Sequence, residues 1–237
     1  MPVYRIAGIC VSMEPKYETL IKQGKAYLLE DGAKADFAIR LSEEFLTAKQ
    51  QAYPHLSRND CEYIWHGSAF YNQILDFGGL FLHASAIAYE GKAYLFSAPS
   101  GTGKSTHTAL WKKQFGSGAE IINDDKPALK LEDGTFFVYG TPFSGKTDQN
   151  RNMRVPLQAI GILSRSAKNR AERMDAKDAL LPILNQTIRP SSPERMDTLL
   201  KLLDVLLSNV PVYSVACNME SEAATVAYHA MKREVTI

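Results

Sequence analysis

"AYLFSAPSGTGKSTH", residues 93–107, joins an apolar run to a glycine-rich loop and then to a helix-forming segment. The run Ala93–Ser97 is expected to be a strand, and Lys104–Lys113 is expected to be a helix. An apolar segment before it, Leu82–Tyr89, predicts a partner strand joined through the two-residue turn Glu90-Gly91. A strand that leads directly into a glycine loop and a helix is the setting of a phosphate-binding P-loop. The sequence therefore predicts an α/β fold built around such a loop.

The loop itself departs from the pattern G-x-x-x-x-G-K-[ST] only at Ala98, which stands at the loop entrance. Gly101 and Gly103 allow the backbone N–H groups to curl around phosphate oxygens. Lys104 is expected to contact the outer phosphates, and the Ser105 hydroxyl is expected to bind Mg²⁺. The predicted nucleotide-binding residues are Ser100, Gly101, Thr102, Gly103, Lys104, Ser105 and Thr106.

Two adjacent carboxylates, Asp124 and Asp125, follow Lys104 by about twenty residues in the segment "EIINDDKPAL", residues 120–129. One helix and one return strand fill that interval, so the pair is expected at the end of the next strand. One carboxylate can hold Mg²⁺ while the other accepts a proton from an incoming hydroxyl. The alternative is a surface turn, since Asp-Asp-Lys-Pro is also good turn sequence.

The segments 82–106 and 120–129 together resemble the catalytic core of the HPr serine kinase/phosphorylase family and its phosphoenolpyruvate carboxykinase relatives. The likeness covers roughly residues 80–165 and implies an HPr-kinase-like P-loop fold. By this resemblance, His83 lies beside the phosphate site and orients or charges the aspartates. Asp124 would be the base that activates the acceptor hydroxyl, and Asp125 would face the metal together with Ser105.

The same resemblance points to basic residues in the loop that follows the next hairpin, where the carboxykinases use an arginine on the transferred phosphoryl group. Lys146, Arg151 and Arg154 are the candidates here, although each could be an ordinary solvated charge. Lys146 and Arg154 join Asp124, His83 and Lys104 as the predicted catalytic set.

The chain also departs from the family. It lacks the glycine- and arginine-rich stretch near the C-terminus of the true HPr kinases, and residues 1–80 do not match their regulatory domain. We expect residues 1–80 to form a small, β-rich α+β segment that binds the acceptor or completes the sheet. Residues 81–237 are expected to form the HPr-kinase-like P-loop catalytic domain.

Further elements are expected from local patterns. Short β-like runs occur at Tyr4–Val11, Ala26–Leu29 and Phe37–Leu41. Later strands are expected at Glu120–Asn123, Ala159–Leu163 and Val212–Cys217, and a hairpin turn is expected at residues 132–134. Helices are expected after the N-cap Ser192 and over Glu220–Arg233.

Composition limits the classes of partner. The 237 residues carry a net charge of +1, so no global field attracts nucleic acid or an anionic membrane. The three cysteines lie far apart without metal-binding spacing, which is typical of reduced thiols. The sequence contains no apolar stretch of about 20 residues that could span a bilayer. These features predict a cytoplasmic protein that binds neither nucleic acid nor membrane.

The expected activity is a Mg²⁺- and ATP-dependent kinase that phosphorylates a hydroxyl. The acceptor would be a serine of a peptide, a protein or a small molecule, and self-association into a homo-oligomer is left open. A small-metabolite kinase of another P-loop family and a nucleotide-sensing module without turnover are the alternatives. The same residues could also catalyse the reverse phosphorolysis, and the sequence does not fix ATP as the donor.

Overall fold

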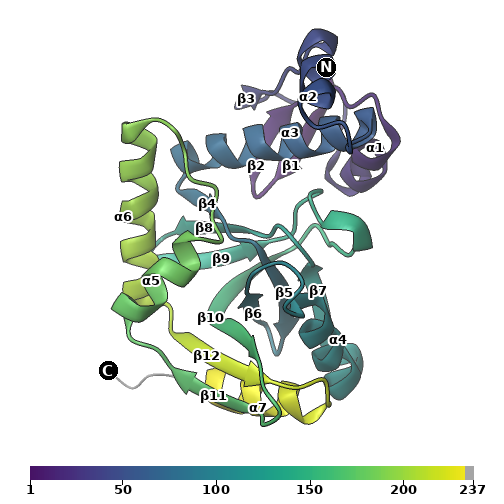
Figure 1. Ribbon diagram of the computed structural model, residues 1–237. Coiled ribbons are helices and arrows are strands. Elements are labelled where there is room, and N and C mark those ends of the chain that lie inside the picture. The colour runs from purple at the N-terminus through teal and green to yellow at the C-terminus, as the bar shows by residue number, and fades with distance from the viewer. Residues whose placement is uncertain (233–237) are drawn as a thin grey trace.

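A computed structural model describes residues 1–232, apart from the side chain of Lys146. The chain is a mixed α/β protein with a three-stranded sheet near its N-terminus and a nine-stranded sheet in the rest (Figure 1). The end of the helix predicted to reach Arg233 lies outside the described residues. None of the described helices combines the length and the apolar character needed to cross a lipid bilayer.

The N-terminal segment is mainly helical, so the prediction that it is β-rich is wrong. Its sheet has only the short strands β1 (Val3–Ile6), β2 (Ile9–Ser12) and β3 (Phe37–Ala38). Its helices are α1 (Glu18–Gly24), α2 (Glu43–Ala52) and α3 (Arg58–Gln73). In the run expected to be a strand at Ala26–Leu29, the first two residues belong to the 3₁₀ turn η1 (Lys25–Tyr27), and Leu28 forms an isolated antiparallel bridge with Tyr4.

Side-chain caps explain where α2 and α3 begin. Ser42 accepts a hydrogen bond from the backbone N–H of Phe45 at the start of α2. At α3, Ser57 and Asp60 form a reciprocal capping box, in which each side chain accepts from the backbone N–H of the other. Such caps satisfy N–H groups that otherwise have no helical partner, and they fix the first turn.

The large sheet follows the order β4-β8-β9-β10-β6-β5-β7, and β12 and β11 extend it from β10. Its strands are β4 (Gly79–Phe81), β5 (Ala84–Tyr89), β6 (Lys92–Ser97), β7 (Ala119–Asn123), β8 (Ala128–Glu132), β9 (Thr135–Tyr139), β10 (Arg154–Arg165), β11 (Arg170–Arg173) and β12 (Val212–Cys217). The start of β10 pairs antiparallel with β9, while its later part pairs parallel with β6 and β12. The long strand β10 thus joins an antiparallel meander to a mixed region, in which β10 is parallel to β6 and β12 while β5, β7 and β11 pair antiparallel (Figure 1).

The predicted hairpin and the following crossover are confirmed. Glu90 and Gly91 have φ values of 49° and 72°, the left-handed pair that a tight two-residue turn requires between β5 and β6. β6 then leads through the loop into α4 (Lys104–Phe115) and returns as β7, which pairs with the far side of β5. Because β5 runs antiparallel between β6 and β7, its start meets the ends of both neighbours at one sheet edge. That edge carries His83, the glycine loop and the Asp124-Asp125 pair.

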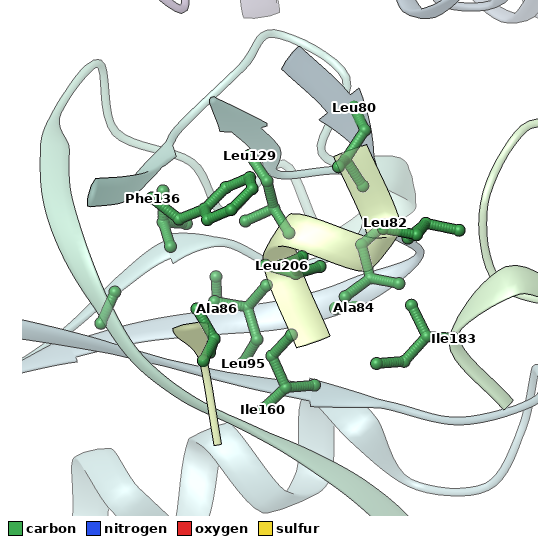
Figure 2. Packing of buried hydrophobic residues seen from close by; sticks show 14 of the residues in the cluster. Leu80, Leu82, Ala84, Ala86, Leu95, Leu129, Phe136, Ile160, Ile183 and Leu206 are labelled. Carbon is green, nitrogen blue, oxygen red and sulfur yellow. The ribbon is translucent and has the colours of Figure 1, made fainter. Parts of the chain in front are cut away.

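Helices cover both faces of the large sheet. Along β6, Tyr94 and Phe96 belong to a buried cluster with α4 and α7 (Glu222–Met231), while Leu95 belongs to another with α5 (Ala176–Leu184) and α6 (Pro193–Asn209). This alternation is what a strand buried on both faces requires. Figure 2 shows Leu95 beside Ile160 and Leu206 in the second cluster. The short 3₁₀ turns η2 (Ile74–Phe77), η3 (Gly116–Gly118) and η4 (Gly145–Thr147) complete the described elements.

The third buried cluster belongs to both parts of the chain. It contains Ile6, Met13 and Phe70 from the N-terminal segment together with Phe81 and Phe143 from the rest. The N-terminal segment therefore packs firmly over one end of the large sheet, beside the edge that carries the loop.

Candidate active site

The glycine loop has the backbone conformation that its sequence requires. Gly101 and Gly103 have φ values of 77° and 121°, which residues with side chains rarely adopt. A Cβ built on either glycine would meet no atom within 4 Å, so the backbone angle alone demands glycine here. The helix α4 begins immediately after the loop, at Lys104. The first turn of α4 thus presents free N–H groups and a partial positive charge beside the loop.

The side chain of Lys104, the first residue of α4, folds back into the glycine loop. Its side chain is buried, and Nζ donates a 3.0 Å hydrogen bond to the carbonyl oxygen of Ala98 at the loop entrance. Burial lowers the pKa of the ammonium, and the carboxylates of Asp125 and Asp124 act in the opposite direction. A phosphate chain in the loop would offer this ammonium a charged acceptor in place of a neutral carbonyl.

Asp124 is only 5% exposed, and both its oxygens accept hydrogen bonds from hydroxyl groups. Ser85 Oγ donates to Oδ1 at 2.6 Å, and Thr147 Oγ1 donates to Oδ2 at 2.9 Å. Ser85 is further fixed by Thr108, whose hydroxyl lies 2.8 Å away. These neutral donors orient the carboxylate without neutralising its charge. None of these three hydroxyl residues is among the predicted site residues.

Asp125 instead has two positively charged or chargeable neighbours. His83 Nε2 lies 3.2 Å from Oδ1, and Lys126 Nζ contacts Oδ2. Burial would raise the pKa of Asp125, but the hydrogen bonds and charges of His83 and Lys126 outweigh it and lower the pKa to about 2. The carboxylate of Asp125 is therefore ionised at neutral pH.

Gln186 positions the His83 ring from the connection that follows α5. The amide oxygen Oε1 of Gln186 lies 3.0 Å from the ring nitrogen Nδ1 of His83. The backbone carbonyl of Gln186 accepts a 2.8 Å hydrogen bond from the backbone N–H of His83. In this arrangement Nε2 of His83 faces Asp125, while the role predicted for His83 at the phosphate site stays a prediction. Gln186 had no signal in the sequence, because it is 103 residues away.

Two predicted basic residues lie away from the loop. Arg154 pairs with Glu132 at 2.7 Å and stacks on Phe137, with its guanidinium carbon 3.3 Å from the ring centroid. Arg151 pairs with Glu120 at 2.7 Å. Strand pairing explains why Arg154 lies away from the loop, contrary to the prediction. The start of β10 pairs with β9, and this pairing fixes the position of the Arg154 side chain.

Lys146 lies in η4, but its side chain is outside the described part of the structure. Lys126, which is not among the predicted site residues, has its ammonium group against Asp125.

A cavity of about 320 Å³, the loop cavity, holds most of the predicted site residues together. It is lined by His83, Ser100, Gly101, Gly103, Lys104, Ser105, Thr106, Asp124 and Asp125. Ser105 and Asp125, the predicted metal ligands, therefore border the same space. Among residues 1–232, no group of three or more His, Cys, Asp or Glu side chains is arranged to hold a metal ion. This donor set still fits Mg²⁺, which is commonly bound through one or two carboxylates, water and substrate phosphates.

A larger cavity adjoins the loop cavity on either side. The C-terminal cleft, of about 660 Å³, lies between α4 and the ends of β10 and β12, and shares Gly101, Gly103 and Thr106 with the loop cavity. The N-terminal cleft, of about 750 Å³, shares Ser100, Ser105 and both aspartates, and its opposite wall comes from α1 and α3.

Each cleft is tied to the site by hydrogen bonds. In the C-terminal cleft, Arg165 donates to the carbonyl oxygens of Gly101 and Thr102, so the end of β10 supports the loop. In the N-terminal cleft, Tyr63 accepts the N–H of Gly145 at 2.9 Å, and Gln23 donates to the carbonyl oxygen of Gly145 at 3.2 Å. The turn that carries Thr147 to Asp124 is thus anchored on α1 and α3.

Comparisons with known proteins found little beyond a distant structural likeness. No protein-family model matches the chain, and no curated protein matches it. Among solved structures, the HPr(Ser) kinase/phosphatase from Coxiella burnetii is similar at 12% sequence identity and a TM-score of 0.36, over 62% of this chain and 92% of that one. A likeness this low assigns neither a family nor an activity, so function must be argued from the site.

Proposed function

We propose that this protein is a Mg²⁺-dependent phosphotransferase that moves the γ-phosphoryl group of ATP to a hydroxyl acceptor, with serine as the expected acceptor group. The observation that carries the proposal is the position of the loop cavity between two larger clefts. Phosphoryl transfer needs a donor and an acceptor on opposite sides of the moving group, roughly in line. A nucleotide sensor would have no use for the second cleft.

The donor is assigned to the loop cavity and the C-terminal cleft. The loop amides and Lys104 would bind the phosphates, and the nucleoside would extend along α4 toward Leu110 and Leu163. Ser105 and Asp125 would hold Mg²⁺, which supplies charge neutralisation at the outer phosphates when it is bound. The low pKa of Asp125 supports this role, because the carboxylate stays ionised throughout the working pH range.

Asp124 is the better candidate for the base. A carboxylate with a pKa of about 2, such as Asp125, is a weak proton acceptor near neutral pH. Asp124 borders both the loop cavity and the N-terminal cleft, and its hydroxyl partners Ser85 and Thr147 fix its orientation. In the proposed step, the acceptor oxygen attacks the γ-phosphorus while the bond between that phosphorus and the bridging oxygen of the ADP leaving group breaks. The hydroxyl proton passes to Asp124, and the products are ADP and a phosphomonoester.

The cations that would stabilise the moving phosphoryl charge differ from the expected arginine. Lys104 borders the loop cavity, and Lys126 borders the N-terminal cleft beside Asp125. We assign them this role in place of Arg154, which is paired with Glu132. Lys146 stays a proposed contributor because it follows Gly145, which lines the N-terminal cleft.

A transfer assay tests this function. The protein is incubated with γ-labelled ATP, Mg²⁺ and a panel of serine-containing peptides, carrier proteins and free serine. We expect a labelled phosphomonoester, formed at least about a hundredfold more slowly by Asp124→Asn while that variant still binds nucleotide. Nucleotide binding without any labelled product across the panel would contradict transfer and favour a sensor. Fast release of inorganic phosphate without an acceptor would indicate an ATPase.

A further inference from the structure

An apolar pocket of about 290 Å³ opens beside the N-terminal cleft, between α3 and Phe143. Tyr63, Ile64 and Lys126 line both the cleft and this pocket, so the two spaces are continuous. The rest of its wall is largely carbon, with Gly67, Tyr71, Phe81, Phe143 and Ile188. The phosphoryl transfer proposed above makes no use of it.

The two tyrosines in the wall present rings rather than free hydroxyl groups. The Tyr63 hydroxyl accepts the N–H of Gly145, and the Tyr71 hydroxyl donates to the backbone carbonyl of Lys126. Tyr71 also packs against Phe81 and Phe143, with ring centroids 4.8 and 5.6 Å apart. A pocket with packed aromatic walls and occupied hydroxyls binds apolar groups by removing them from water.

A glycine in the middle of α3 shapes this wall. Gly67 is helical and buried, although glycine destabilises a helix interior relative to alanine. A Cβ at this position would lie 3.1 Å from the Phe143 ring, tighter than an ordinary contact. The missing side chain lets Phe143 lie directly against α3, where it forms part of the pocket.

Another cavity, also of about 290 Å³, adjoins the apolar pocket. It shares Phe81 and Lys126 with the apolar pocket, and its other lining residues are the polar His83, Asp125, Asn185, Gln186 and Thr187. Three hollows therefore meet around Lys126: the N-terminal cleft beside Asp124, the apolar pocket and this polar cavity. Such a series suits an elongated ligand with alternating polar and apolar groups.

We infer that the apolar pocket receives a large apolar side chain of a peptide acceptor, close in sequence to the serine whose hydroxyl reaches Asp124. The inference rests on the proposed phosphotransferase function and names the class of its acceptor. Cavities for drug-sized ligands measure roughly 300–1,000 Å³, so a pocket at the lower limit suits one bulky side chain. Free serine would leave the pocket empty, whereas a peptide can fill it and place backbone amides along the polar cavity.

The test compares five-residue peptides that have a central serine among glycines with the same peptides carrying one phenylalanine within two positions of the serine. Transfer from ATP and peptide binding by calorimetry are both measured. Ile64→Trp fills the shared mouth of the pocket, at a side chain that is 40% exposed and so tolerates the change. Leu200→Trp, at a 44% exposed position on α6, is the matched control. A thermal melt verifies that both variants fold.

We expect at least one phenylalanine peptide to exceed the glycine peptide in kcat/KM by roughly tenfold to a hundredfold. Ile64→Trp should abolish this preference, measured as the ratio of kcat/KM between the phenylalanine and glycine peptides, while Leu200→Trp behaves as the wild type. Equal rates for all peptides, or a preference that survives Ile64→Trp, would overturn the pocket and leave the kinase standing. Phenylalanine-dependent binding that Ile64→Trp removes, without transfer, would support the pocket and overturn the kinase. Neither transfer nor selective binding would overturn both.

Discussion

Replacing Asp125 with asparagine removes the carboxylate charge that His83 and Lys126 stabilise beside the glycine loop. The pKa of Asp125 falls from its ordinary value of 3.8 to about 2 in the folded protein, because these two partners outweigh the effect of burial. A depressed carboxylate pKa contributes stability that is fully present above the unfolded-state pKa. That contribution is lost as the pH falls through the folded-state pKa.

The size of the effect follows from the shift. One pKa unit corresponds to about 1.4 kcal/mol, so lowering the pKa of Asp125 to about 2 is worth about 2 kcal/mol at pH 7. The linkage relation leaves about half of this contribution at pH 3. We therefore expect Asp125→Asn to lower the free energy of unfolding by about 2 kcal/mol at pH 7 and by about half as much at pH 3.

Urea unfolding at pH 7, 5, 4 and 3 measures the difference between the wild type and the variant. Asp133→Asn is the matched control, since Asp133 is exposed in the β8–β9 turn at a φ of 46°, where asparagine is tolerated as readily. The control should differ from the wild type by less than about 0.5 kcal/mol at every pH. A loss in Asp125→Asn that is absent at pH 7, or that does not shrink toward pH 3, would refute the electrostatic argument.

Three further variants test other parts of the structure. Lys104→Ala should remove most of the stabilisation that saturating Mg²⁺–ATP provides, about 2.7 kcal/mol at a hundred times the Kd, and an unchanged nucleotide-induced melting shift would contradict the loop assignment. Gly103→Ala should cost about 1–3 kcal/mol in urea unfolding because its φ of 121° strains any side chain, and a neutral result would refute that backbone requirement. Ser192→Ala should cost about 1 kcal/mol through the lost bond to the Arg195 N–H, with helix content and melting temperature as the readout.

The central part of the fold could be predicted because its signals are local. The turn at Glu90-Gly91, the glycine loop before Lys104 and the cap at Ser192 all depend on residues within a few positions of one another. The Asp124-Asp125 pair could be placed at the sheet edge because one helix and one strand fit the interval before it.

The missed features depend on contacts that are distant along the chain. α3 contains aromatic residues and a central glycine, which weaken its helical pattern, so its formation relies on the Ser57 capping box and on packing. Ser85 lies within an apolar strand, so its sequence context predicts a core residue. Its contact with Asp124 is visible only in the folded structure. Gln186 reaches His83 only through the packing of α5 against the sheet. Arg154 could not be excluded from the site before its pairing with Glu132 was known.

The proposed function requires that the residues around the loop cavity transfer a phosphoryl group to an acceptor instead of hydrolysing or merely binding ATP. The most direct test is a single-turnover reaction with protein in excess over γ-labelled ATP and Mg²⁺, quenched in the presence of the phenylalanine-containing serine peptides. If phosphoryl transfer takes place, the label lost from ATP appears mainly as a peptide phosphomonoester, with one ADP formed for each. Label that stays in ATP, or that appears as inorganic phosphate whether or not peptide is present, would contradict it.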